Sequence, residues 1–162
     1  MSKLLNRKSV IKVKKYLEYI DNSIKLILLD ETARTAIDAA RSLDKQVGSI
    51  VKSLLFKSTE FNDYYLCLVS GDKYADIDKI SILTSTKIKK ASAEECKKFT
   101  GFSIGAVSPV AHDNIPKKIF IDKNLNNYEM VYAAAGHPFV VFAISYNKLC
   151  KVTKGKIENI VI

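Results

Sequence analysis

The sequence predicts one domain of the α/β or α+β class, in which a mixed, mostly antiparallel sheet is surrounded by helices. The chain has 162 residues, which fits a single domain over residues 1–162, and 48% of them are apolar, enough for a substantial core. Amphipathic helical segments alternate irregularly with short apolar runs of strand length, and several of these runs are neighbours in the chain. With only 6 Gly and 3 Pro, the collagen-like and linker-like classes are excluded.

The first half of the chain shows two helical patterns and three strand patterns. Val10, Val13 and Leu17 are spaced to share one face of a helix, and Thr32 is the expected cap of a second amphipathic helix. The expected elements are a helix over 10–20, a strand over 24–30, a helix over 33–43, and strands over 49–57 and 64–71.

The second half continues the alternation. Ser92 and Glu95 form a Ser-x-x-Glu capping box, which predicts that a helix begins there. The expected elements are helices over 75–84 and 92–99, strands over 117–124, 128–135 and 139–145, and a final helix over 145–153.

The charge of the chain indicates a polyanionic partner. Lys and Arg number 26 against 17 Asp and Glu, giving a net charge of +9. Nucleic acid is the usual partner of such a surplus, and an anionic membrane surface is the alternative. Only three of the cations are arginines. Because lysine binds phosphate as a point charge, we expect contacts to the nucleic-acid backbone more than readout of bases.

No membrane-spanning segment, metal site or cofactor is expected. The most apolar stretch, residues 131–144, is interrupted and too short to cross a bilayer, and no signal peptide is apparent at the N-terminus. Cys67, Cys96 and Cys150 are odd in number and far apart, which argues against a disulfide framework and a zinc site. A reducing, cytoplasmic location is the natural interpretation.

Motifs for nucleotide chemistry are missing. Gly155-Lys156 is followed by Ile157 and lacks the upstream glycine of a phosphate-binding loop, and no GxGxxG occurs. Residues 101–105 do match GxSxG, the nucleophile motif of α/β-hydrolases, with Ser103 as the candidate nucleophile. The context differs, because a helix is expected before this serine and a proline follows where the next helix should run.

Two further features are candidates for binding. The spacing Gly105-x-x-x-Pro109 is typical of a tight loop whose main-chain N–H groups approach a ligand, although it also fits a plain surface turn. Lys52 shares a strand face with Ile50 and Leu54. Such a lysine either lies along a sheet edge or points into a polar cleft.

The two histidines differ in their surroundings. His137 follows Gly136 at the start of an apolar strand, where it is either a structural residue or within reach of a ligand. His112 is expected to be a solvent-exposed loop residue.

Taken together, these segments resemble a known family. In order and spacing, ETARTAIDAARSL, KSLLFK, TGFSIGAVSP, VYAAAG and AAAGHPFVVFAISYNKLCKV are similar to the YbaK/prolyl-tRNA-synthetase-associated editing domain. The likeness extends from about Ile24 to the C-terminus. Members often follow the loop proline with Phe or Leu and then Gly, whereas Val110-Ala111-His112 stands here.

The resemblance implies a trans-acting aminoacyl-tRNA deacylase that removes a wrong amino acid from the 3′ adenosine of tRNA. It implies that Lys52 contacts the terminal phosphates and Gly105 positions the ester, with His137 as a less uniform third site residue. It also implies that no metal or side-chain nucleophile is needed, because a ribose hydroxyl assists the attacking water. The expected substrate-binding residues are Thr35, Phe102, Ser103, Ala106, Val107, Ser108, Pro109 and Gly136.

The expected partners are mischarged tRNA and, beyond it, an aminoacyl-tRNA synthetase. Two alternatives stay open at this point. One is a non-catalytic RNA-binding or synthetase-associated module on the same fold, and the other is a serine hydrolase that uses Ser103.

Overall fold

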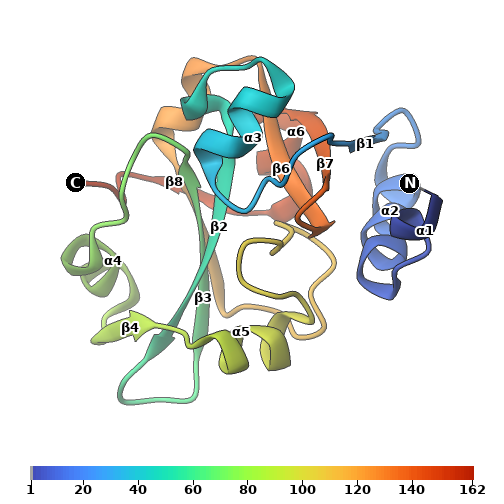
Figure 1. Ribbon diagram of the computed structural model, residues 1–162. Coiled ribbons are helices and arrows are strands. Elements are labelled where there is room, and N and C mark those ends of the chain that lie inside the picture. The colour runs from blue at the N-terminus through green and yellow to red at the C-terminus, as the bar shows by residue number, and fades with distance from the viewer. Residues whose placement is uncertain (1) are drawn as a thin grey trace.

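The computed structural model describes residues 2–162, which form two β-sheets and six α-helices (Figure 1). The larger sheet has the strand order β4-β2-β3-β5-β8, and the smaller has the order β1-β7-β6. The predicted mixed class of helices and strands is confirmed. The strands are divided between two sheets, however, where the sequence suggested one.

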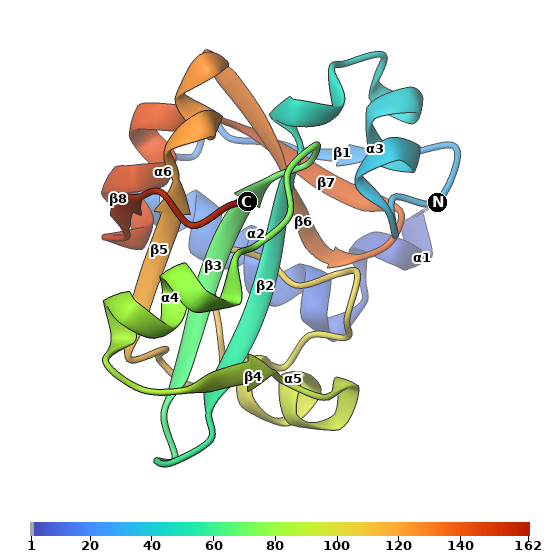
Figure 2. The ribbon, with the colours of Figure 1, turned by 90° about the vertical axis from the view of Figure 1, so that its left-hand side faces the viewer.

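The larger sheet is built on a long antiparallel hairpin of β2 and β3, and β4 extends it antiparallel to the end of β2. On the other side, β5 runs parallel to β3, and β8 runs parallel to β5. Figure 2 shows β5, β3 and β2 side by side. The strands are β2 (Val51–Ser58), β3 (Tyr64–Ser70), β4 (Ile88–Lys90), β5 (Lys118–Asp122) and β8 (Lys156–Glu158).

The smaller sheet is fully antiparallel, and β7 lies between its two neighbours. A register shift between Ala134 and His137 interrupts the pairing of β6 with β7. A parallel bridge between Ile50 and Tyr132 joins this sheet to the start of β2. The strands are β1 (Leu26–Leu28), β6 (Met130–His137) and β7 (Val140–Ser145).

Polar side chains cap several helices. The expected capping box of Ser92 and Glu95 is confirmed, since Ser92 Oγ accepts from the Glu95 N–H and Glu95 accepts from the Ser92 N–H. The helices are α1 (Ser2–Leu5), α2 (Lys8–Ile20), α3 (Ala36–Leu43), α4 (Ile77–Thr84), α5 (Ala93–Thr100) and α6 (Tyr146–Thr153).

The expected start of α3 is wrong. Thr35, and not Thr32, caps the helix, because Thr35 Oγ1 accepts from the N–H of Asp38 at 3.1 Å. The preceding residues are held elsewhere: the Ala33 N–H donates to the carbonyl of Pro138 at 2.6 Å. That tertiary contact keeps this segment extended beside the β6–β7 turn.

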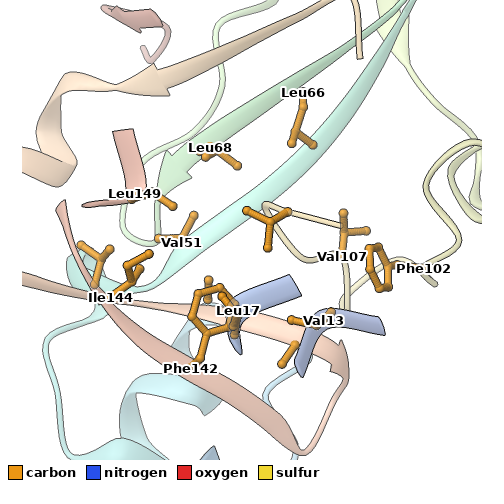
Figure 3. Close-up of a cluster of buried hydrophobic side chains, with 14 of the residues drawn as sticks. Val13, Leu17, Val51, Leu66, Leu68, Phe102, Val107, Phe142, Ile144 and Leu149 are labelled. Atoms are coloured by element: carbon orange, nitrogen blue, oxygen red, sulfur yellow. The ribbon is translucent and has the colours of Figure 1, made fainter. Parts of the chain in front are cut away.

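The main core lies between α2 and the two sheets. Val10, Val13 and Leu17 are fully buried, as the helical spacing predicted, and they pack in the same cluster as Leu66 and Phe142 (Figure 3). Figure 1 shows α1 and α2 along one side of the molecule, beyond β6 and β7. The N-terminal segment is therefore part of the core that supports β6.

The other predicted elements are present with shifted ends. The strand expected over 24–30 has only three paired residues, and the one expected over 49–57 begins after a 3-10 turn at Val47–Ser49. The short elements α1, β4 and β8 were not predicted, because three or four residues carry too little periodicity to be recognised.

Two expectations about buried and membrane segments can be compared with the structure. Cys67 is buried in the larger sheet, and the three cysteines are free thiols. None of the described helices combines the length and the apolar composition needed to cross a lipid bilayer.

Candidate active site

A cavity of about 350 Å³ lies where β2 passes β6. Most of its wall comes from four parts of the chain: the start of α3 with the residues before it, the first half of β2, the middle of β6 and the segment 104–107 after α5. Single residues or pairs are added from elsewhere, namely Gly71, Lys90, Ala91, Cys96 and Val141. Most of the lining side chains are apolar, such as Ile50, Leu55 and Val107. This volume lies in the range of about 300–1,000 Å³ that is typical of small-molecule sites.

The charged residues that line the cavity all carry positive charge. They are Arg34, Lys52 and Lys90, and no Asp, Glu or His of residues 2–162 joins them in the wall. A cleft with charges of one sign and apolar walls concentrates ligands of the opposite sign. The cavity is therefore built for an anionic group, and its described wall offers no carboxylate or imidazole as a general base.

Lys52 extends from β2 at one side of this cavity. Its ammonium group donates to the backbone carbonyl of Lys73 and lies 4.9 Å from the ring centroid of Tyr74. Burial lowers the pKa of Lys52, while the nearby carboxylates of Asp72 and Asp122 oppose this effect. Within residues 2–162, no carboxylate lies within ion-pair distance of its ammonium group. The ammonium therefore lacks a direct counter-ion, which an anionic ligand could supply.

The glycine-rich segment after α5 forms another wall. Helix α5 ends at Gly101, whose φ is +85°, and Gly105 has a φ of +86°, a left-handed conformation that favours glycine. A Cβ atom at Gly105 would lie 3.6 Å from the backbone oxygen of Arg34. Gly105 and Arg34 are therefore neighbours in the cavity wall.

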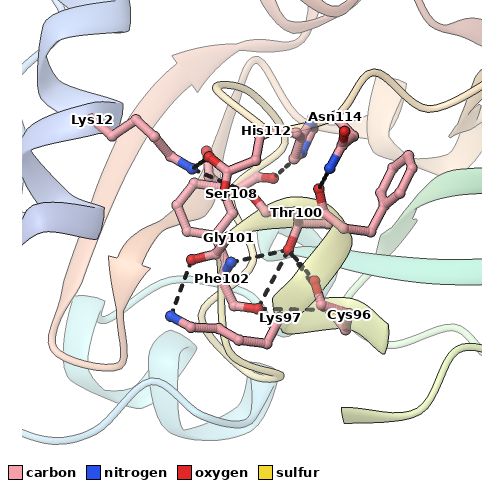
Figure 4. A network of polar contacts seen from close by, with 11 residues as sticks. Lys12, Cys96, Lys97, Thr100, Gly101, Phe102, Ser108, His112 and Asn114 are labelled. Carbon is pink, nitrogen blue, oxygen red and sulfur yellow. Dashed lines mark hydrogen bonds and ion pairs between the residues drawn. The ribbon is translucent and has the colours of Figure 1, made fainter. Parts of the chain in front are cut away.

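This segment presents free backbone donors to the cavity. In the described chain the N–H groups of Ile104, Gly105 and Val107 have no hydrogen-bond acceptor, and all three residues line the cavity. A hydrogen bond to the end of α5 anchors the loop, since the Phe102 N–H donates to Thr100 Oγ1 at 3.0 Å (Figure 4). An anionic oxygen in the cavity would find unpaired N–H groups on a supported backbone.

The predicted site residues fall into two groups. Lys52, Gly105, Thr35 and Val107 all line the cavity, although they come from three distant parts of the chain. The remaining predicted residues lie outside its lining. Phe102, Ala106, Ser108 and Pro109 are buried within the loop, and Ser103 is exposed. Gly136 and His137 are the last residues of β6, directly before the β6–β7 turn.

Helix α2 contacts both the glycine loop and that turn. The Lys12 ammonium pairs with Asp113 at 2.7 Å, donates to the carbonyl of Thr100 and lies 4.3 Å from the ring centroid of Phe102 (Figure 4). One helical turn away in sequence, Ser9 Oγ donates to the carbonyl of Gly136 at 2.8 Å. The N-terminal helix therefore links two segments near the cavity.

Glycine is required where α2 approaches so closely. At Gly136, where φ is +88°, a Cβ atom would lie 2.7 Å from the backbone oxygen of Ser9. At Gly101 a Cβ atom would meet only the movable ends of Asp113 and Lys12, so there it is the φ of +85° that favours glycine. The close contact with Ser9 gives Gly136 a packing role.

His137 lies half-buried next to the segment that carries Arg34. Its Nδ1 accepts a hydrogen bond from the Phe139 N–H at 3.1 Å, which leaves Nε2 as the protonated nitrogen of the neutral ring. Burial lowers the pKa of His137, and the positive charges of Arg7 and Arg34 lower it further. At neutral pH this histidine is an uncharged hydrogen-bond donor through Nε2.

The GxSxG match at 101–105 lacks the surroundings of a nucleophile. Ser103 follows the end of a helix and not a strand, and its hydroxyl has no histidine or carboxylate partner within residues 2–162. Two aspartates that follow Ser103 in the chain also have other partners: Asp113 pairs with Lys12, and Asp122 accepts from the Ser70 N–H. The catalytic dyad of a serine hydrolase is not assembled.

The expected exposure of His112 is wrong. The ring is half-buried, its Nε2 lies 2.7 Å from the carbonyl oxygen of Ser108, and it packs edge-on against Phe102. Burial lowers the pKa of His112. This histidine supports the glycine loop from inside, at the position where the sequence departs from the pattern of the family it resembles.

Several lining residues were not found by sequence reasoning. Arg34 and Lys90 complete the positive lining, and Tyr132 and Ile104 contribute apolar surface. The sequence around Arg34 has no binding motif of its own. Arginine is rare among the cations of this chain, and this was the one signal that could have drawn attention to Arg34.

Comparisons with known proteins agree on one kind of domain. Residues 30–152 match the family model described as aminoacyl-tRNA editing domain. A candidate trans-editing enzyme for prolyl tRNA synthetase is similar in structure, with 32% sequence identity, a TM-score of 0.89, and coverage of 96% of this chain and 98% of that chain.

Two further solved structures are similar over nearly their whole length. One comes from a study of epitope backbone grafting onto scaffold proteins, with 29% identity, a TM-score of 0.88, and coverage of 96% of this chain and 98% of that chain. The other is a hypothetical protein with 24% identity, a TM-score of 0.84, and coverage of 93% and 99%, which shows a shared fold. No curated protein matches the sequence.

Proposed function

Because this chain belongs to the aminoacyl-tRNA editing domain family, we propose that it is a deacylase that acts in trans on mischarged tRNA. The reaction is hydrolysis of the ester between a wrongly attached amino acid and the 3′-terminal adenosine. All residues that line the cavity lie between Ala33 and Val141, within the matched range 30–152. We therefore assign the reaction to this cavity.

The observation that carries this assignment is the charge of the cavity wall. Its charged members Arg34, Lys52 and Lys90 are all cations, and the described wall contains no carboxylate. The end of an aminoacyl-tRNA offers phosphates followed by an uncharged ester. An apolar cavity with cations in its wall is complementary to such an end, and the net charge of +9 favours tRNA over most other substrates.

In this proposal Lys52 binds the phosphate next to the terminal adenosine. Its ammonium lacks a direct counter-ion, and it is held by the Lys73 carbonyl and the Tyr74 ring. Because Lys52 extends from a strand, its backbone position is fixed, and a phosphate bound to its ammonium orients the ester relative to the rest of the cavity. Orientation of this kind contributes to catalysis as well as to binding.

The free N–H groups near Gly105 bind the carbonyl oxygen of the ester. Water adds to the carbonyl carbon, and the negative charge that develops on the oxygen is stabilised by these donors. The bond between the carbonyl carbon and the ribose oxygen then breaks, and the ribose oxygen takes up a proton. The products are the free amino acid and tRNA with an intact 3′ end.

The attacking water needs a base, and the described cavity wall supplies no carboxylate or imidazole. We assign a proton relay to the free hydroxyl of the terminal ribose, which neighbours the ester in the substrate itself: it takes the proton of the attacking water as it gives its own proton to the leaving ribose oxygen. The protein then contributes orientation and charge stabilisation. His137 contributes a neutral Nε2–H donor near Arg34, where it can hold the substrate at the mouth of the cavity.

A synthetase is a second proposed partner, because the similar structure is described as a trans-editing enzyme for prolyl tRNA synthetase. A non-catalytic RNA-binding module on this fold is the alternative function. The same feature favours both, since a cationic cavity without a described acid or base can bind an RNA end without cleaving it.

Deacylation of mischarged tRNA tests the proposal directly. Purified protein is incubated with tRNA charged with alanine, cysteine, serine or threonine, and the loss of each aminoacyl ester is followed over time. We expect at least one species to be hydrolysed well above its spontaneous rate. Hydrolysis of none of them, combined with binding of the same tRNA, would favour the RNA-binding module.

A further inference from the structure

An exposed aromatic ring contacts Lys52, one of the cations that line the cavity. The side chain of Tyr74 is 74% exposed, and its ring centroid lies 4.9 Å from the Lys52 ammonium nitrogen. Tyr19 and Phe61 are also strongly exposed. Of the three, Tyr74 alone contacts a cavity cation within residues 2–162.

The backbone that carries Tyr74 is fixed on both sides. The N–H of Ile162 donates to the carbonyl of Tyr74 at 3.1 Å, and Ala75 forms an antiparallel bridge with Val161. On the other side, the Lys73 N–H donates to the carbonyl of Ser70 at 3.0 Å. The backbone that carries the ring is therefore fixed and not part of a free loop, which lowers the entropy cost of stacking a ligand on the ring.

We propose that Tyr74 is a stacking site for the base of the penultimate nucleotide of the tRNA. This inference rests on the proposed function, in which Lys52 binds the phosphate that joins the last two nucleotides. The base on the 5′ side of that phosphate then lies within reach of a ring centred 4.9 Å from the ammonium. Single-stranded RNA is commonly bound by a cation on its backbone and an aromatic ring under its base.

Two chemical features of the site agree with this role. Lys52 approaches the ring as a cation does in a cation–π pair, so that bound phosphate, ammonium and ring form one contiguous surface. All tRNA substrates share their 3′ end, so stacking on a base of that end is available with each of them. The subsite would thus add affinity for tRNA without selecting the amino acid.

The test compares two substrates that differ only beyond the terminal nucleotide. One is mischarged tRNA, and the other is the same amino acid esterified to adenosine 5′-monophosphate, which keeps the phosphate assigned to Lys52 and lacks the penultimate base. We expect Tyr74→Ala to lower kcat/KM for the tRNA by about 5- to 150-fold, the range that base–aromatic stacking spans, mainly through KM. Activity on the aminoacyl adenosine monophosphate should change little, because the Lys73 carbonyl still holds the Lys52 ammonium in the variant.

Two variants serve as controls. Tyr74→Phe keeps the ring and should retain the activity of the unmodified protein on tRNA. Tyr19→Ala removes a tyrosine of α2 that is 88% exposed and, within residues 2–162, forms no cation–π pair. This substitution should have no effect on either substrate. Equal losses on both substrates, or no loss on tRNA, would overturn the proposal.

A second readout does not depend on catalysis. The probe is an RNA minihelix without an attached amino acid that carries the fluorescent base pyrrolocytosine at its penultimate position. Stacking of this base on Tyr74 should quench the fluorescence of the base when the RNA binds. The unmodified protein and Tyr74→Phe should show the quenching, and Tyr74→Ala should not. Equal quenching by Tyr74→Ala would also overturn the stacking site. Absence of deacylation by the unmodified protein would instead count against the proposed function, and the quenching would still decide on Tyr74.

Discussion

Replacing Lys52 with alanine should separate activity from stability. The change removes a charge-assisted hydrogen bond to the Lys73 carbonyl, worth about 1.5–3 kcal/mol when buried and less at this partly exposed ammonium, and a cation–π contact with Tyr74, worth about 0.5–1 kcal/mol. It also removes the desolvation penalty that lowers the pKa of Lys52. Because these effects oppose each other, we expect the free energy of unfolding to change by no more than about 1 kcal/mol. That corresponds to a shift in Tm of about 2–4 °C at most for a chain of this size.

The expected loss of activity is much larger. Two opposite unit charges about 4 Å apart attract each other by about 4 kcal/mol at an effective dielectric constant of about 20. Water that replaces the ammonium in the variant recovers part of this energy. We therefore expect the single-turnover rate at subsaturating protein to fall by about 10²- to 10³-fold. Lys52→Arg should also be poor, because a planar guanidinium places its charge elsewhere.

The assay is single-turnover deacylation of one mischarged tRNA by the unmodified protein and the two Lys52 variants. Lys123→Ala serves as the matched control, since Lys123 is an exposed lysine in the 3-10 turn Lys123–Asn127, and its loss should weaken binding only slightly. Thermal denaturation of all four proteins measures stability. If Lys52→Ala and Lys123→Ala lose activity to the same extent, Lys52 is a surface lysine and the reasoning is refuted.

Three further substitutions test the surroundings of the cavity. Gly105→Ala should keep the fold, since the new Cβ would meet Arg34 only at 3.6 Å. The φ of +86° should lower Tm by about 2–8 °C, and the rate of deacylation should fall. Full activity of this variant would mean that the loop is a structural turn without a part in the reaction. Lys12→Ala should lower the free energy of unfolding in urea titrations at pH 7, and the lost ion pair with Asp113 should account for about 0.2–1 kcal/mol of the decrease. Lys12 lowers the pKa of Asp113, so this ion-pair part should be complete above the ordinary value of 3.8 and be lost as pH falls through the lowered one, whereas the parts from the Thr100 carbonyl and the Phe102 ring remain. Ser103→Ala should deacylate normally, and covalent labelling of Ser103 by a fluorophosphonate would contradict that expectation.

Local sequence patterns determined the helices and the long strands. The spacing of Val10, Val13 and Leu17 identified α2, and the Ser92–Glu95 capping box identified α5, because both patterns involve residues within one or two helical turns. The apolar run of β3 likewise identified a strand whose residues are mostly buried. Where a tertiary contact competes with a local signal, the prediction failed, as at Thr32, whose neighbour Ala33 is bound to the β6–β7 turn.

The sequence also pointed to Lys52 and Gly105, and the tertiary structure decided what surrounds them. These two residues share a cavity only because β2 passes β6 at the Ile50–Tyr132 bridge and the loop after α5 returns against Arg34. The positive lining, the position of Tyr74 beside Lys52, and the absence of carboxylates from the described wall depend on contacts between residues far apart in the chain. Periodicity and capping operate between near neighbours, whereas a cavity forms where distant segments fail to fill the space between them. The sequence therefore determined the longer elements and four residues of the cavity wall, and the packing of the two sheets determined the site.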